Sequence, residues 1–137
     1  MASATQIVPL SKAAIWTGRV MSALPVLMVL MSSGMKLMRL PAVVDGFHRA
    51  GIAERLIIPV GVIELICCVV YLIPRTSVLG AILMTGLLGG ATITTLRIGD
   101  PTYPMPVALG MLAWGGLWLR DLRLRALIPL LASQRDS

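Results

Sequence analysis

Histidine and cysteine are scarce in this chain of 137 residues. His48 is the single histidine, which excludes a metal site built from several histidines and a haem held by two histidines of one chain. The two cysteines, Cys67 and Cys68, are neighbours, so there is no CxxC redox pair. Neighbours in a helix point about 100° apart, which leaves only a strained vicinal disulfide open. We interpret the cysteines as packing residues and predict no metal.

Charge of either sign is also rare, at 13% of residues against 57% hydrophobic ones. This composition is too apolar for an ordinary soluble domain. The net charge of +6 comes from basic residues at the ends of apolar runs, not from one polar patch. That arrangement favours anionic lipid headgroups over nucleic acid as the contact. Residues 1–137 are therefore predicted to form one membrane domain.

Four apolar runs approach the roughly 20 residues that cross a bilayer. Lys12 precedes the first run, but no small-residue cleavage site follows it, so we interpret it as a retained span and not a signal sequence. Pro104 and Pro106 restrict the start of the fourth run and predict an irregular turn there. The fold expected is an all-α integral membrane bundle of four transmembrane helices, with spans Ala13–Met35, Leu56–Ile73, Ser77–Leu96 and Thr102–Leu119.

The polar connection between the first two runs repeats apolar residues at helical spacing, with Gly51 as a helix stop. This predicts a short amphipathic helix on the membrane surface or over the end of the bundle. Seven basic residues fall on the side of the termini and five on the other. With Arg120, Arg123 and Arg125 beside a span end, we predict cytoplasmic termini in a bacterial inner membrane.

Glu64 is a carboxylate inside the otherwise uncharged apolar run Ile57–Ile73. A charge at that depth costs several kcal/mol unless it has a partner or a water-filled site. Lys36 and Arg97 end the spans before and after it on the same side of the bilayer, and we expect them as its partners. One interpretation is a structural ion pair. The other is a carboxylate that moves a proton or holds a lipid-soluble hydroxyl.

The candidate site therefore lies at the non-cytoplasmic end of the bundle. Glu64 and Lys36 are its candidate catalytic residues. The candidate ligand-binding residues on the same side are Arg97, His48, Asp45, Tyr103 and Thr95. In the third run, Gly86 and Gly90 form a GxxxG pair that continues to Thr94, which predicts close approach of another helix, from this chain or from a second copy.

Several short motifs, taken together, resemble the DoxX-like family of small membrane proteins. The resemblance extends from about Ile15 to Pro129 and implies four transmembrane helices. It is carried by Ser33–Leu37, Gly61–Leu65, Ile73–Ala81, Gly89–Ala91, Gly99–Pro101 and Trp114–Asp121.

The family resemblance implies mixed functions. Some relatives are associated with quinone-linked thiosulfate oxidation, and others with redox complexes or with maturation and trafficking of proteins. Relatives often carry a histidine where this chain has Thr95, which argues against histidine-based proton or haem chemistry here.

Three functions follow as hypotheses. The first is a membrane component of a redox system with a quinone near Glu64, Lys36 and Arg97. The second is a noncatalytic assembly protein that binds another membrane or redox protein, or a second copy as a homodimer. The third is a small intramembrane isomerase or hydrolase with Glu64 as proton shuttle. It needs a second proton-handling group, for which Lys36, His48 and Tyr103 are candidates.

Overall fold

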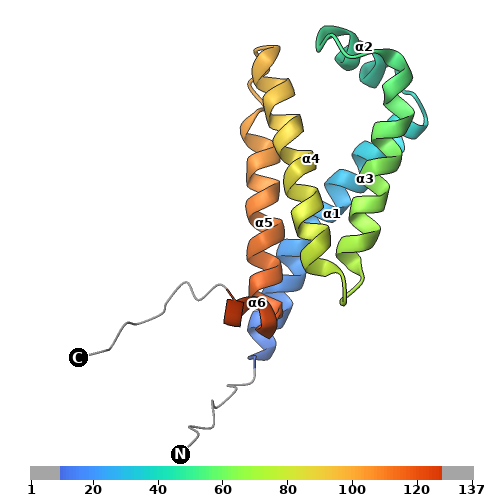
Figure 1. Cartoon of the computed structure of the whole chain (residues 1–137). Coiled ribbons are helices and arrows are strands. Elements are labelled where there is room, and N and C mark those ends of the chain that lie inside the picture. Colours follow the sequence, from blue (N-terminus) through green and yellow to red (C-terminus); the bar gives the residue numbers. More distant parts are fainter. Residues whose placement is uncertain (1–9, 128–137) are drawn as a thin grey trace, which may run out of the picture.

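The computed structural model describes residues 10–127, and every regular element in this part of the chain is helical. Four helices are long, and three short ones lie at their ends (Figure 1). In chain order the elements are α1 (Lys12–Leu37), α2 (Pro41–Arg49), the 3₁₀ turn η1 (Glu54–Leu56), α3 (Ile57–Leu72), α4 (Ser77–Arg97), α5 (Pro104–Arg120) and α6 (Leu122–Leu127).

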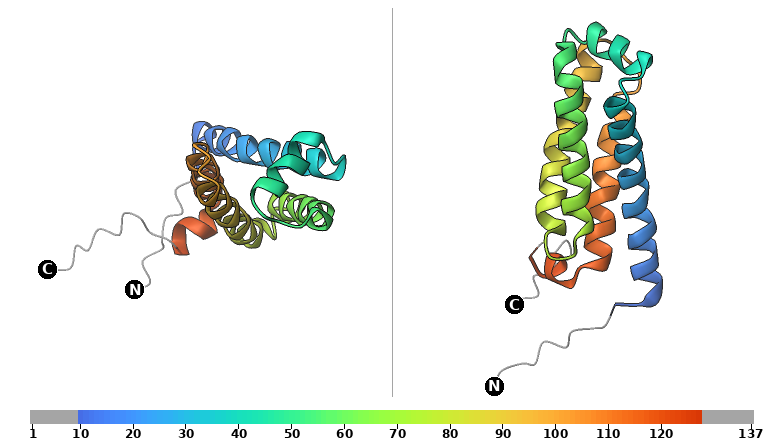
Figure 2. Two further views of the ribbon diagram at one scale, coloured as in Figure 1. Left: turned by 90° about the horizontal axis from the view of Figure 1, so that it is seen from above. Right: turned by 90° about the vertical axis from the view of Figure 1, so that its right-hand side faces the viewer.

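The four long helices run up and down beside one another, as the right-hand view of Figure 2 shows. Helices α1 and α4 each pack against both α3 and α5. The connection containing α2 and η1 lies at one end of this bundle, which we call the α2 end, and α6 lies at the other, which we call the α6 end (Figure 1). Connections this short make consecutive helices antiparallel neighbours.

Local sequence sets where the helices begin and end. The Ser11 hydroxyl caps α1 by accepting a hydrogen bond from the Ala14 amide at 3.1 Å. Pro41 and Pro104 occupy the first positions of α2 and α5, where a missing N–H costs nothing. Gly51 and Gly99 follow the ends of α2 and α4 with φ of 69°, a conformation that glycine adopts without strain. The predicted amphipathic helix and its stop at Gly51 are confirmed.

Three helical segments are long and apolar enough to cross a membrane: Lys12–Leu37, Glu54–Leu72 and Ser77–Arg97. They coincide with the first three predicted spans to within a few residues. The fourth predicted span corresponds to α5, which is 17 residues long and begins at Pro104 after an irregular turn, as expected.

Close helix contacts at the α6 end depend on glycine. A Cβ on Gly80 of α4 would overlap the backbone of Tyr71 at the end of α3. Between α1 and α5, a Cβ on Gly116 would come within 2.8 Å of the Ser22 amide, and one on Gly18 within 2.8 Å of the Gly116 carbonyl oxygen. Small residues thus bring both helix pairs together at this end.

The GxxxG pair of α4 is arranged differently. A Cβ added to Gly86 or Gly90 would meet no atom within 4 Å. The predicted close approach of a helix therefore does not occur at these glycines within the described part of the chain. In Figure 1 the α4–α5 pair and the α1–α3 pair diverge toward the α2 end. Gly86 lies at the middle of α4 and Gly90 one turn closer to that end.

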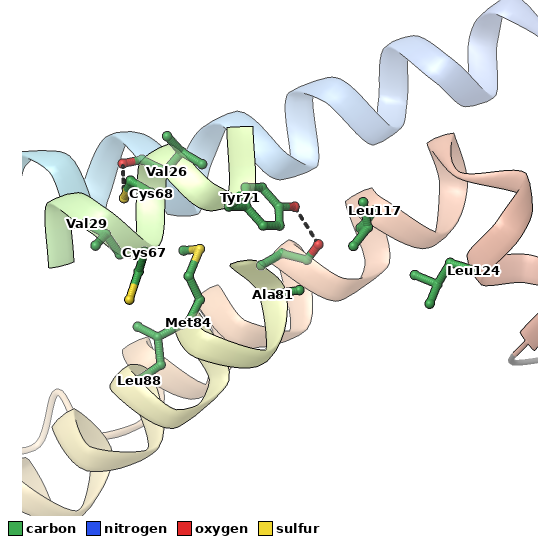
Figure 3. Close-up of a cluster of buried hydrophobic side chains, with 11 residues drawn as sticks. Val26, Val29, Cys67, Cys68, Tyr71, Ala81, Met84, Leu88, Leu117 and Leu124 are labelled. Atoms are coloured by element: carbon green, nitrogen blue, oxygen red, sulfur yellow. Dashed lines mark hydrogen bonds between the residues drawn. The ribbon is translucent and has the colours of Figure 1, made fainter. Parts of the chain in front are cut away.

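The core between the long helices is formed mainly by aliphatic and sulfur-containing side chains (Figure 3). Cys67 and Cys68 are both buried there as free thiols, as their interpretation as packing residues requires. Tyr71 is fully buried, and its hydroxyl donates to the Ala113 carbonyl at 2.7 Å and lies 2.8 Å from Ser22 Oγ. Burying a hydroxyl group without such hydrogen-bond partners would cost about 1–3 kcal/mol.

Candidate functional site

Glu64 forms an ion pair with Lys36 across the α1–α3 contact. Lys36 Nζ lies 2.8 Å from Glu64 Oε1 and also donates to Ser32 Oγ, one turn earlier on α1, at 2.5 Å. Ser32 in turn lies 3.4 Å from Glu64 Oε1. The predicted pairing of Lys36 with Glu64 is confirmed. Close to this ion pair, the Ser33 hydroxyl of α1 donates to the Gly61 carbonyl of α3 at 2.7 Å and so holds the two helices together.

The second oxygen of Glu64 has no such partner. Glu64 is only 7% exposed, and its Oε2 is buried without a hydrogen bond from any described residue. A carboxylate oxygen has strong acceptor capacity, and leaving it unmet in a buried place costs free energy. Buried unpaired groups of this kind are rare and point to strain, a functional role or a missing partner.

Glu64 lines a groove of about 530 Å³ between α3 and α4, with α2 over its outer end. Gly86 and Gly90 form part of its wall, and the absence of side chains there leaves the space open. Most of the other lining residues are apolar. The charged ones are Lys36 and Glu64 on α1 and α3, and Arg49 and Asp100 at the α2 end. Its lining residues include Lys36, Phe47, Val60, Glu64, Leu87 and Gly90.

Thr95 also lines this groove, but its hydroxyl is already engaged. Its Oγ1 lies 3.0 Å from the Ala91 carbonyl and 2.9 Å from the Thr92 carbonyl of the same helix. Thr95 therefore offers a ligand its oxygen lone pairs and its methyl group more readily than a donor.

The other predicted ligand-binding residues lie outside the groove wall. Arg97, expected as a partner of Glu64, lines a separate hollow at the α2 end with His48. Among the described residues Glu64 is paired with Lys36, so the expected Arg97 contact is wrong. Asp45 lies on the exposed side of α2, and Tyr103 precedes α5 with 43% of its surface exposed.

Three further residues lie at the α2 end that were not predicted as site residues: Glu54, Arg49 and Asp100. Glu54 forms an ion pair with Arg39, and its Oε2 lies 3.4 Å from His48 Nε2. Arg49 and Asp100 line both the groove and the neighbouring hollow. The only sequence signal for Glu54 is its position two residues before the second apolar run, among basic residues.

Asp100 is held as a carboxylate by the turn that precedes α5. Its Oδ1 accepts hydrogen bonds from the Thr102 hydroxyl at 2.7 Å and from the Thr102 amide at 2.9 Å. These bonds, and to a smaller extent the Arg49 guanidinium, lower the pKa of Asp100 below its ordinary value. The rim of the groove therefore keeps a negative charge at neutral pH.

This arrangement provides one hydrogen-bond acceptor deep in an apolar groove, beside an ammonium group that is already paired. Such a site fits an amphiphile whose donor reaches Glu64 Oε2 while its apolar part contacts the walls.

Comparison with known proteins identifies the family. No curated protein and no solved structure matches the chain significantly. The family model described as the DoxX-like family matches residues 20–116, which include Lys36, Glu64 and all of α4. The match covers more than half of the chain and agrees with the resemblance found in the sequence motifs. The protein is therefore an integral membrane protein that belongs to the DoxX-like family.

Proposed function

We propose that the protein binds a lipid-soluble hydroxyl compound of the quinol class in the α3–α4 groove, as a membrane component of a redox system. The observation that carries this proposal is the unpartnered Oε2 of Glu64 in the wall of an apolar groove. A ring hydroxyl of a quinol would donate to that oxygen. Val60, Leu87 and Phe47 would contact the ring and tail, and their burial would supply most of the affinity.

We further propose that α5 is a fourth span. Its 17 residues extend about 26 Å at 1.5 Å per residue, close to the thickness of the hydrocarbon core. Four spans would put both ends of the described chain on one side of the membrane. The arginines at the α6 end support a cytoplasmic side for these ends and a bacterial inner membrane as the location.

The test is ligand binding to purified protein in lipid nanodiscs. The probes are a short-chain quinol and its dimethyl ether, which has the same ring but no hydroxyl donor. We expect the ether to bind at least about tenfold more weakly, because a hydrogen bond to a charged group contributes about 1.5–3 kcal/mol. Glu64→Gln should weaken quinol binding by a similar factor and largely remove the difference between the probes.

A second variant keeps the test meaningful if Glu64→Gln fails to fold. Gly90→Leu fills the groove at a position with open space, so we expect it to fold and to lose quinol binding. Gly89→Leu is the matched control, because it adds the same side chain one residue earlier, on the face toward α5. Equal binding of both probes, or equal binding by wild type and Gly90→Leu, contradicts the proposal.

The glycine face of α4 favours a second candidate function, in which the groove receives a helix of another membrane protein or of a second copy. Crosslinking after extraction in a mild detergent tests it. A crosslinked partner or homodimer that Gly90→Leu abolishes supports helix binding, and recovery of the lone monomer alone rules it out.

The isomerase or hydrolase hypothesis gains less support. His48 is paired with Glu54, and Tyr103 is exposed before α5, so neither of these candidate proton-handling groups contacts Glu64. Lys36 does, at 2.8 Å.

A further inference from the structure

A second polar hollow lies at the α6 end, on the opposite side of the bundle from the groove. It has a volume of about 280 Å³, and the described residues that line it include three arginines and one acid. Its lining residues are Pro74, Arg75, Ser77, Leu117, Arg120, Asp121 and Arg123.

Arg120 is held in place by Tyr71. Its guanidinium carbon lies 5.4 Å from the centre of the Tyr71 ring, a cation–π contact, and Tyr71 is itself fixed by its two hydrogen bonds in the core. The Nε of Arg120 is buried and has no hydrogen-bond acceptor among residues 10–127. An arginine with this unmet donor, lining a basic hollow, is suited to an anion.

The single acid of the hollow does not neutralise it. Asp121 Oδ1 accepts the backbone N–H of Arg123 at 2.8 Å, which caps the start of α6. Arg75 and Arg123 are exposed, and no ion pair joins either of them to a described acid. The hollow therefore has a net positive charge.

The start of α4 adds to this positive field. Ser77 lines the hollow as the first residue of α4, and the preceding Thr76 gives the helix no side-chain cap. The first amides of a helix carry partial positive charge and bind anions. The Ser77 hydroxyl does not cap these amides, because it donates to the carbonyls of Tyr71 and Ile73, both at 2.9 Å.

We propose that this hollow binds the phosphate of an anionic lipid headgroup in the leaflet on the α6 side. The neighbouring apolar residues favour a lipid over a soluble phosphate, because Leu72, Ile73 and Leu79 are 56%, 46% and 52% exposed at the same end of α3 and α4. They would contact the acyl chains below the headgroup. This site is independent of the Glu64 groove and of any ligand that the groove binds.

Native mass spectrometry of the full chain in detergent tests the proposal, with phosphatidylglycerol and phosphatidylcholine as the added lipids. We expect wild type to retain phosphatidylglycerol in preference to phosphatidylcholine. Because a basic residue near an anionic lipid surface contributes about 1 kcal/mol, each arginine removed should weaken retention about fivefold. The variant is Arg75→Gln with Arg123→Gln, since both residues are exposed and their replacement should leave the fold intact.

Arg19→Gln is the control for the loss of one positive charge at this end, and is compared with each single variant, Arg75→Gln and Arg123→Gln. Arg19 lies at the same end of the bundle on α1 and carries the same charge, but it stacks on Trp16 at 5.8 Å and does not line the hollow. Three results would overturn the proposal. They are equal retention of phosphatidylglycerol by the double variant and wild type, an equal loss in Arg19→Gln, and displacement of the lipid by inorganic phosphate at equal concentration.

Discussion

Gly80 and Gly90 lie ten residues apart on α4 and have opposite surroundings. Gly80 faces the backbone of Tyr71 with no room for a methyl group, whereas Gly90 faces open space in the groove wall. The sequence shows both as glycines in an apolar helix and does not distinguish them. The difference arises from the angle between α3 and α4, which is a property of tertiary packing.

The first prediction concerns these glycines. Gly80→Ala should destabilise the bundle by about 1–3 kcal/mol or more, because α3 and α4 must separate to admit the methyl group. Gly86→Ala meets no atom within 4 Å and should be neutral or stabilising by up to about 1 kcal/mol. Thermal unfolding midpoints in one detergent give the comparison. Equal midpoints for the two variants contradict the close α3–α4 contact.

The Lys36–Glu64 pair gives the second prediction. Lys36→Met leaves the buried Glu64 carboxylate without its cation and should cost about 3–5 kcal/mol. Replacing both residues, as Lys36→Met with Glu64→Leu, removes the two charges together and should recover most of that loss. Unfolding midpoints of the two single variants and the double variant measure this coupling. A double variant as unstable as the sum of the singles contradicts it.

At the scale of the elements, the stability of the turn before α5 depends on pH. The pKa of Asp100 is lowered mainly by the Thr102 hydroxyl, so this turn is stabilised above the ordinary Asp pKa. The stabilisation begins to decrease as the pH falls below about 4, the ordinary pKa of an Asp side chain. It is gone once the pH is below the lowered pKa of Asp100 in the folded protein.

The third prediction follows from that turn. Thr102→Val removes the hydroxyl donor and should raise the pKa of Asp100 toward its ordinary value. The ¹³C shift of the Asp100 carboxyl group, followed by NMR from pH 6 downward, reports it. Thr94→Val is the control, because the Thr94 hydroxyl donates to the Gly90 carbonyl within α4. An unchanged inflection in Thr102→Val contradicts the assigned cause.

Sequence periodicity and composition predict these elements well. Apolar length gives the long helices, and the repeat of Val43, Phe47 and Ala50 gives α2. They also predict which end of the bundle each polar residue reaches, which was enough to pair Lys36 with Glu64. They do not give rotation about the helix axis, so Arg97 was expected beside Glu64 but lines another hollow.

At the scale of the whole molecule, the sequence predicts a membrane bundle because hydrophobic length and charge placement are properties of each segment. The groove is different, since its volume depends on the tilt between two helix pairs. Its glycines were predicted as a helix-packing face, and only the assembled structure shows the open space beside them.

The fourth prediction tests the proposed topology with single cysteines in a background of Cys67→Ala and Cys68→Ala. A membrane-impermeant thiol reagent applied to intact cells should label Thr102→Cys, in the turn before α5. It should not label Arg123→Cys on α6. Labelling at both positions contradicts α5 as a span, and labelling at Arg123→Cys alone reverses the orientation.

The divergence of the helix pairs toward the α2 end has a mechanical consequence. The tight glycine contacts of α4 with α3 and of α1 with α5 lie at the α6 end, whereas nearer the α2 end α3 is joined to α1 by the Ser33–Gly61 hydrogen bond and the Lys36–Glu64 ion pair. We therefore expect α3 to tilt about its contacts at the α6 end together with α1, and not alone. The 16 residues of α3 make an arm of about 24 Å, and a tilt of about 5° moves the far end by about 2 Å. A change of this size in the width of the groove requires almost no displacement at the pivot, so we expect the groove to accept ligands of different widths.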